Sequence, residues 1–194
     1  MKKFTARQQE IIKASTELVA EQGIQGVTIK KLSKKIGISE SAIYRHFDSK
    51  LDILLGILSQ FRSHKMEVLD KIQGSGATEL EQLEMIFKER FNQFTQYPAI
   101  TAVIFSEDIF QNEKELADEV YAIMNSSLQL ILIVIKKGQN NKSIRSDISA
   151  DQLSLIIVGA LRLLVARWRL SGFAFDLRRE GDKLWGNINQ ILVN

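Results

Sequence analysis

Small, polar and cationic residues occur together between Thr28 and Lys50, in the stretch TIKKLSKKIGISESAIYRHFDSK. Serine and alanine are small enough to let a helix enter the major groove of DNA, where serine can hydrogen-bond a base and alanine can contact a thymine methyl group. Glutamate can accept a hydrogen bond from a cytosine amine, and lysine or arginine can bind guanine or a phosphate. These residue types therefore favour recognition of nucleic acid.

The same stretch predicts two sets of DNA contacts. The candidates for base contacts are Lys30, Glu40, Ser41, Ala42 and Arg45. Phosphate contacts fix the register and contribute salt-dependent affinity, and the candidates for them are Thr28, Ser39, Tyr44, His46 and Lys50. Phosphate contact is the alternative for Lys30 and Arg45. A half-buried packing ring is the alternative for Tyr44, and a surface position without a role is the alternative for His46.

Two short helices joined by a tight turn are expected to position these side chains. Thr28 can cap the first helix, Gly37 supplies the backbone freedom for the turn, and Ser39 can cap the second helix. Ile43 and Phe47 lie four residues apart, so they predict the buried side of the second helix. Its remaining residues then face outward.

This pattern resembles the TetR family of bacterial transcriptional regulators. The resemblance rests on VTIKKLSKKIGISESAIYRHFDSKLDIL, preceded by a helix that ends in EQGIQG. It covers roughly the first quarter of the chain, and the remainder fits the family in length and all-helical character. One departure is Ser33, where the family usually has alanine against the turn, but serine is nearly as small and the packing should survive. By resemblance, the matching Thr, Tyr, His and Lys positions contact phosphates.

An all-α fold with two domains is expected. Residues 1–50 are predicted to form a three-helix helix-turn-helix domain that binds DNA, and residues 51–194 a helical domain for effector binding and dimerisation. The first helix should begin at a capping box of Thr5 and Gln8 and end at Gly23. The apolar periodicity predicts further helices at about residues 50–72, 78–97, 113–137, 149–170 and 176–193, and no strand.

Positive charge is concentrated at the N-terminal end of the chain. Residues 1–50 contain ten Lys or Arg against five Asp or Glu, and the remaining residues contain sixteen against eighteen. This asymmetry suits a polyanion-binding module followed by a neutral body, with an ordinary solvated basic surface as the alternative. There is no cysteine and there are only two histidines. We therefore expect no catalytic residue, no metal site and no cofactor.

Two apolar runs, at residues 128–135 and 153–170, are candidates for membrane-spanning segments. The first is far shorter than the roughly 20 residues that a span requires. The second contains Arg162 and Arg167, which are costly inside a bilayer. Both runs therefore favour buried helices of a bundle. No signal peptide opens the sequence, so a cytoplasmic location is expected.

The resemblance also implies a ligand site, because the C-terminal helices of this family commonly enclose a pocket for a small inducer. The aromatic and Met residues of the C-terminal body suit a largely apolar ligand. The candidate pocket residues are Phe87, Arg90, Phe91, Phe94, Phe105, Tyr121, Met124, Asn125 and Leu128. Aromatic residues at helical spacing are usually core, so packing is the alternative for the whole set.

A homodimer is implied as well, since TetR-like proteins generally pair through their two C-terminal helices. The predicted interface residues are Leu155, Gly159, Leu163, Trp185, Ile188 and Leu192. The alternative is that both helices fill the core of one chain. A twofold dimer would read two half-sites about 34 to 36 Å apart on double-stranded DNA. The sequence thus predicts a repressor that leaves a palindromic operator when a small effector binds, with an activator or a non-specific, architectural DNA-binding protein as alternatives.

Overall fold

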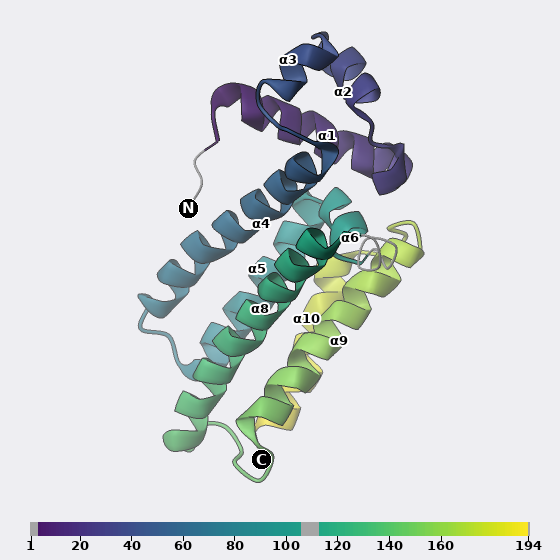
Figure 1. Cartoon of the computed structure of the whole chain (residues 1–194). Coiled ribbons are helices and arrows are strands. Elements are labelled where there is room, and N and C mark those ends of the chain that lie inside the picture. Colours follow the sequence, from purple (N-terminus) through teal and green to yellow (C-terminus); the bar gives the residue numbers. More distant parts are fainter. Residues whose placement is uncertain (1–3, 106–112, 194) are drawn as a thin grey trace. The chain divides into compact units, whose positions relative to one another are not determined.

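Helices make up the regular structure of the part of the chain that the structure describes. This computed structural model describes residues 4–105 and 113–193, without the side chains of residues 63–71 and 73. Figure 1 labels the helices in chain order. They are α1 (Ala6–Gly26), α2 (Ile29–Ile36), α3 (Glu40–Tyr44), α4 (Lys50–Gln73), α5 (Glu79–Gln96), α6 (Ala99–Ile104), α8 (Lys114–Asn140), α9 (Ala150–Leu170) and α10 (Leu177–Leu192). The predicted all-α fold is confirmed, and these described residues contain no strand.

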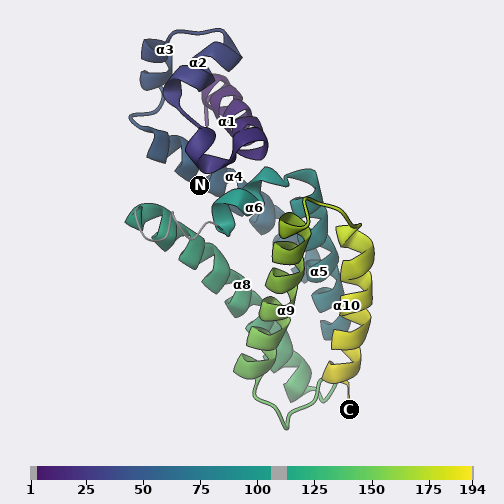
Figure 2. The same ribbon diagram turned by 90° about the vertical axis from the view of Figure 1, so that its right-hand side faces the viewer.

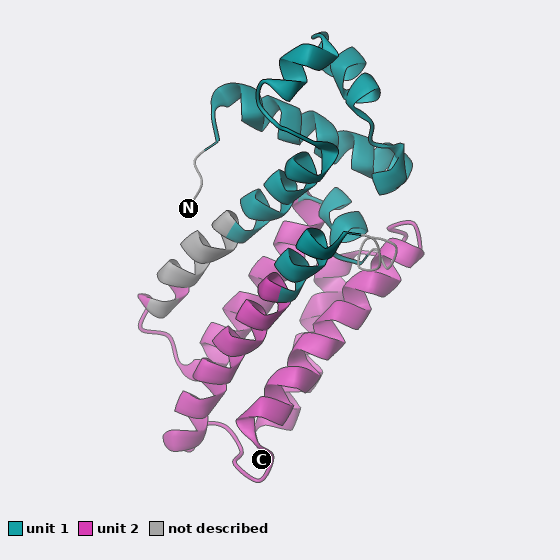
Figure 3. Cartoon of the chain, in the orientation of Figure 1, with its two compact units in different colours: residues 1–65, 97–121 teal, residues 66–96, 122–194 magenta. Residues whose placement is uncertain are grey.

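The chain divides into two compact units, which Figure 3 colours separately. Unit 1 contains residues 1–65 and 97–121, and unit 2 contains residues 66–96 and 122–194. Both α4 and α8 pass from one unit into the other. The domain boundary expected after residue 50 falls at the start of α4, within unit 1, and stays a prediction.

In unit 1, α1 begins at the capping box that its sequence suggests. The Gln8 backbone N–H donates to Thr5 Oγ1 (3.3 Å), and the Thr5 N–H donates to Gln8 Oε1 (3.0 Å). Gly23 has a φ of 69°, which residues with a side chain rarely adopt, and it kinks the helix where its end was predicted. Ile11 and Ile12 are fully buried on the inner side of α1.

A short helix from much later in the sequence also packs against α1. All residues of α6 are buried, and the Thr101 hydroxyl donates to the Pro98 carbonyl oxygen (2.6 Å). This bond satisfies a polar side chain that has no access to water, which unpaired burial would make costly. The core of unit 1 therefore includes a segment that lies outside the predicted DNA-binding domain.

In unit 2, α5, α9 and α10 pack against one another (Figure 2). The Phe87 ring lies 5.4 Å from the Trp185 ring and meets the Phe91 ring edge-on at 5.6 Å, measured between centroids. Phe91 covers Gly181 so closely that a Cβ atom at that position would lie 2.3 Å from Phe91 Cδ2. The absence of a side chain at Gly181 thus allows α5 and α10 to approach.

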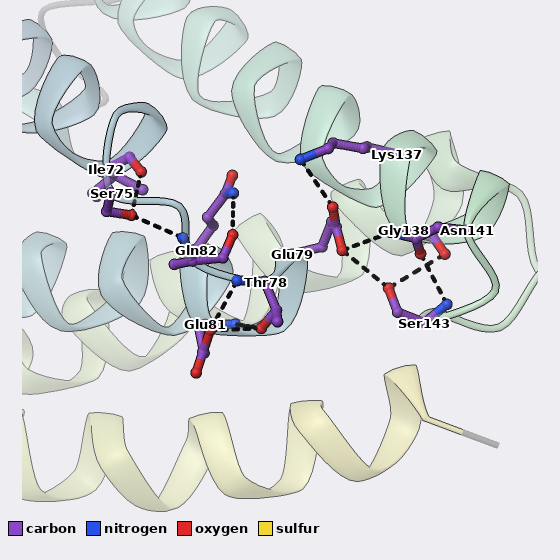
Figure 4. Close-up of polar contacts among 11 residues, drawn as sticks. Ile72, Ser75, Thr78, Glu79, Glu81, Gln82, Lys137, Gly138, Asn141 and Ser143 are labelled. Carbon is purple, nitrogen blue, oxygen red and sulfur yellow. Dashed lines mark hydrogen bonds and ion pairs between the residues drawn. The ribbon is translucent and has the colours of Figure 1, made fainter.

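A buried carboxylate fastens the beginning of α5 to the end of α8 (Figure 4). Glu79 is 5% exposed, and its two oxygens accept from Asn141 Nδ2 (2.9 Å) and Ser143 Oγ (3.3 Å) and pair with Lys137 Nζ (3.0 Å). The hydrogen bond from Asn141, followed by that from Lys137, lowers the pKa of Glu79 to about 2. The carboxylate is therefore ionised at neutral pH. We call these four residues the Glu79 clamp.

Among the described helices, α8 alone is long and apolar enough to cross a membrane. Its Leu116, Ile123 and Ile135 side chains are buried within the chain, whereas Asn125 and Gln129 are exposed. A buried apolar face opposite a polar one is the pattern of a helix in a bundle. This division supports the interpretation of residues 128–135 as part of a core helix.

Candidate functional site

The turn between α2 and α3 is built by local hydrogen bonds. The Lys31 N–H donates to Thr28 Oγ1 (3.2 Å), and the Ala42 N–H donates to Ser39 Oγ (3.2 Å), so both predicted caps are confirmed. Gly37 has a φ of 78°, and its N–H and that of Ile38 both donate to the Ser33 carbonyl oxygen. This left-handed position ends α2 and turns the chain into α3.

Ser33 fits against the turn as expected. Its side chain is buried, and its hydroxyl donates to the Lys30 carbonyl oxygen (2.9 Å). A buried hydroxyl without such a bond would destabilise the fold. The replacement of the alanine that is usual at this position therefore leaves the polar group satisfied.

The two sides of α3 differ as the sequence predicts. Ile43 and Phe47 are buried in unit 1. Glu40, Ser41 and Arg45 are exposed, Ala42 is partly exposed, and Tyr44 is 50% exposed. The Ser41 hydroxyl lies 2.9 Å from Ser39 Oγ. The beginning of α3 thus presents small side chains on a surface, with polar and cationic ones following.

The lysines of α2 divide into paired and exposed ones. Lys31 Nζ donates to Gln22 Oε1 (2.6 Å), and Lys35 Nζ pairs with Glu21 (2.9 Å) and Glu17 (3.3 Å) on α1. The hydrogen bond to Glu21 raises the pKa of Lys35. Lys30 is exposed and has no ion-pair partner within the described part of the chain. Lys31 and Lys35 therefore help to hold α2 on α1, whereas Lys30 is exposed on the surface.

His46 and Lys50 follow α3 in the sequence. Lys50 begins α4, as predicted, and is partly buried; that burial lowers the pKa of its ammonium group, and the nearby Glu113 opposes the shift. His46 is also partly buried, and its backbone carbonyl accepts a hydrogen bond from Gln8 Nε2 (3.1 Å). Sequence reasoning recognised Gln8 only as half of a capping box, since nothing local signals its second bond.

The predicted pocket residues differ in how far the described structure buries them. Phe87, Phe91 and Phe94 are buried in unit 2, and the first two pack on each other. Tyr121 is 64% exposed, and Asn125 is exposed. The remaining members, which are partly buried, are Arg90, Phe105, Met124 and Leu128.

Within this set, Arg90 has the most unusual surroundings. Its Nη1 donates to Gln93 Oε1 (2.7 Å), and Gln93 is almost completely buried. Burial lowers the pKa of Arg90 to about 10. A cation and an amide thus lie one helical turn apart on α5, and both are of the residue types that bind polar groups of ligands. Their assignment to a ligand site stays a prediction.

The predicted dimer residues separate into exposed and buried groups. On α9, Leu155 and Leu163 are each 63% exposed, and Gly159 is exposed between them. On α10, the side chains expected to meet a partner are instead buried in the core of the chain; these are Trp185, Ile188 and Leu192. The apolar stripe of α10 thus packs on α5 and α9 within the chain, and the part of these three residues in a dimer interface stays a prediction.

Two further apolar residues of α9 and α10 are exposed on the surface. Ile156 on α9 and Ile191 on α10 are about half exposed. A Cβ atom at Gly159 or at Gly186 would meet no atom of the chain within 4 Å. The exposed apolar residues of α9 and α10, together with these two glycines, are called the α9–α10 face below.

Two sequence families match the chain, and together they cover nearly all of it. The family described as bacterial regulatory proteins, tetR family, matches residues 11–57, and the C-terminal region of YsiA-like proteins matches residues 58–192. The chain belongs to the TetR family. The resemblance found in the sequence is thereby confirmed, and it makes the protein a DNA-binding transcriptional regulator.

Curated relatives from the TetR family cover the same length as this chain. The fatty acid metabolism regulator protein of Bacillus subtilis (strain 168) is 22% identical over 177 residues, 91% of each chain. The nucleoid occlusion factor SlmA of Vibrio cholerae serotype O1 is 27% identical over 185 residues, 92% of each chain. Relatives with two different cellular roles therefore have similar sequences.

Solved TetR-family structures have the same fold. The regulator FadR from Bacillus subtilis, solved in complex with stearoyl-CoA, has a TM-score of 0.81 at 19% identity, covering 95% of this chain and 98% of that one. The fatty acid degradation regulator FadR from Bacillus halodurans has a TM-score of 0.82 at 22% identity, covering 97% of both chains. At these identities the likeness concerns the fold alone.

Proposed function

We propose that this regulator is a homodimeric, cytoplasmic repressor that binds a palindromic operator and is released by a small, largely apolar ligand. The observation that carries the proposal is the surface of α3, where small and polar residues lie exposed while the backbone is held by two caps and a glycine turn. A rigid helix with an open outer side suits insertion into the major groove.

The proposed base contacts come from the exposed side of the turn. Glu40, Ser41 and Ala42 stand at the beginning of α3, and Lys30 and Arg45 add exposed cations. Phosphate contacts are proposed for Thr28, Ser39, Tyr44, His46 and Lys50. The hydroxyls of Thr28 and Ser39 accept from backbone N–H groups, so their own hydrogens can be donated to phosphate oxygens.

Dimerisation is proposed through the α9–α10 face. Leu155, Ile156 and Leu163 leave apolar surface exposed on α9, and glycine in a helix carries a cost that close approach of a second helix would offset. Leu163→Glu should yield monomers in sedimentation experiments. The matched control is Ile133→Glu, because Ile133 is 59% exposed on α8. If both variants stay dimeric, another surface must mediate association.

The proposed effector carries a long apolar chain and a polar or anionic group. Support comes from the relative solved with stearoyl-CoA, from the buried aromatic residues of α5, and from the partly buried Arg90 with its hydrogen bond to Gln93. Stearoyl-CoA should release the operator at concentrations where acetyl-CoA and free coenzyme A do not. Equal release by all three would contradict recognition of the acyl chain, and release by none would exclude this ligand class.

The relatives that are nucleoid occlusion factors favour a second candidate function, in which the protein organises chromosomal DNA without an effector. A binding selection separates the two. Purified protein is incubated with fragments of its source genome at near-physiological salt, and the retained fragments are sequenced. Enrichment of one palindrome beside a few genes supports the repressor. Retention of fragments dispersed over the genome supports the chromosomal function.

The absence of catalytic activity also stays a prediction. It is supported by the family assignment, which is to regulatory proteins.

A further inference from the structure

We infer that Gln8 is a positioning residue for the recognition helix, acting through a hydrogen bond that ties the beginning of α1 to the end of α3. Its side chain amide donates through Nε2 to the His46 carbonyl oxygen (3.1 Å), although the two residues are 38 positions apart. The inference rests on the proposed operator binding by α3.

The recognition helix needs such a tie because it is short. It has five residues, and helices of this length have little stability of their own. Its beginning is held by the Ser39 cap. At its end, the His46 and Phe47 N–H groups both donate to the Ile43 carbonyl oxygen. The Gln8 bond then attaches the His46 carbonyl to α1.

The location of this bond links it to the DNA contacts. It anchors the backbone at His46, and Tyr44 and Arg45 directly precede that residue. These three residues include two proposed phosphate contacts and one proposed base contact. A shift of the backbone here would move all three side chains together, while the Ser39 cap would still hold the beginning of α3.

The capping box of α1 makes the glutamine specific for this task. Gln8 Oε1 accepts from the Thr5 N–H (3.0 Å), which leaves the amide nitrogen to face His46. One side chain must therefore accept at one end and donate at the other, and only an amide does both at this length. A glutamate in this position would keep the capping box but would turn a carboxylate oxygen toward the His46 carbonyl.

Gln8→Glu is thus a nearly isosteric test. We expect operator affinity to fall about tenfold, in line with the loss of a hydrogen bond and its replacement by a repulsive contact. Affinity for unrelated DNA should fall less, so the specificity ratio should decrease. Because the cap of α1 is preserved, the unfolding midpoint should fall by no more than about 6 °C, which leaves the fold intact at the temperature of the binding assay.

The added negative charge needs its own control, because any carboxylate near DNA weakens binding. Gln9→Glu places the same charge one residue away, on an exposed side chain whose amide donates to the Phe4 carbonyl oxygen. We expect Gln9→Glu to weaken operator and unrelated DNA equally and to preserve the specificity ratio. The same loss of specificity in both variants would overturn the positioning role, and so would unchanged operator binding by Gln8→Glu.

Amide hydrogen exchange of the free protein tests the tie without an operator. In Gln8→Glu, the amides of His46 and Phe47 should exchange faster, while those of Leu32 and Ser33 in α2 remain as protected as in the unaltered protein. Unchanged protection of His46 and Phe47 would overturn the inference. If the unaltered protein binds no operator, the proposed function fails, but the exchange measurement still decides whether Gln8 orders the end of α3.

Discussion

The α2–α3 turn and the α5–α9–α10 bundle are stabilised by different kinds of contact. The turn uses two caps, a glycine and the Gln8 bond, all of which act on the backbone. The bundle uses aromatic rings, with Phe87 between Phe91 and Trp185, and adds the Glu79 clamp. Hydrogen bonds to the backbone leave the outward side chains of α3 available to bind DNA. Packing instead buries the side chains of the bundle, so they cannot bind a partner.

This difference bears on function. A recognition helix must be rigid and yet keep one side open, which backbone hydrogen bonds allow. A helical body that accepts an effector must instead change its packing, and a tightly packed interior opposes such change. The two halves of the proposed mechanism therefore depend on contacts that respond differently to substitution.

The largest effect is expected where the open side of α3 is blocked. Ser41→Arg should reduce operator affinity on the order of a hundredfold, because the long side chain displaces contacts in both half-sites. Competition binding with operator and unrelated DNA measures this. Gln60→Arg adds the same charge to an exposed position on α4 and serves as the control. Unchanged operator affinity in Ser41→Arg would show that α3 does not read the bases.

A second substitution tests the dense packing of unit 2. Gly181→Ala places a methyl group against the Phe91 ring, 2.3 Å from Cδ2, and should lower the free energy of unfolding by about 1–3 kcal/mol. Gly186→Ala on the same helix meets no atom of the chain and should raise it by about 0.5–1 kcal/mol. Urea unfolding measures both, in a Leu163→Glu background so that association does not contribute. Equal effects would contradict the close approach of α5 and α10.

The Glu79 clamp should make stability depend on pH in the acidic range. Its pKa is lowered from 4.5 to about 2 on folding, so the stabilisation is present above pH 4.5 and is lost as the pH falls toward 2. Since Lys137 is largely exposed and its charge is screened, we expect about 1–2 kcal/mol at neutral pH.

Glu79→Gln tests this dependence. The difference in unfolding free energy between the variant and the unaltered protein should be largest at neutral pH and should vanish near pH 2. Glu180→Gln is the control, because the ion pair of Glu180 with Lys183 lies on the surface of α10. A difference that stays constant between pH 7 and pH 2 would mean that the charge of Glu79 does not stabilise the fold.

The smallest effect concerns a single phosphate contact. Lys50→Ala should weaken binding to all DNA sequences and reduce the magnitude of the salt slope by about 1 for each half-site. Lys35→Ala is the control, because Lys35 is already paired with Glu21 and Glu17. A loss confined to one base position would contradict the phosphate role of Lys50.

The predictions from sequence succeeded where the contacts are local. Thr5, Thr28 and Ser39 were recognised as caps, and the structure has all three. The periodicity also identified Ile43 and Phe47 as the buried side of α3. Each of these features depends on residues within one or two helical turns of one another, so the pattern of residue types contains the whole interaction.

For α10, periodicity identifies an apolar stripe but not the surface that covers it. Trp185, Ile188 and Leu192 form such a stripe, and the structure uses it for the core. In the C-terminal helices, core and interface residues share one composition, and only their location distinguishes them.

The sequence by itself determined the helical fold and the turn, because caps and hydrophobic spacing depend on residues that are close together in the sequence. It also indicated the family through the motif around the turn. Tertiary structure alone decided which residues Gln8 and Glu79 bind. Gln8 bonds His46, 38 residues away in the sequence, and Glu79 bonds Asn141, 62 residues away. It also decided which apolar residues remain exposed. These contacts arise from the way separate helices pack, and side-chain spacing within one helix carries no information about its neighbour.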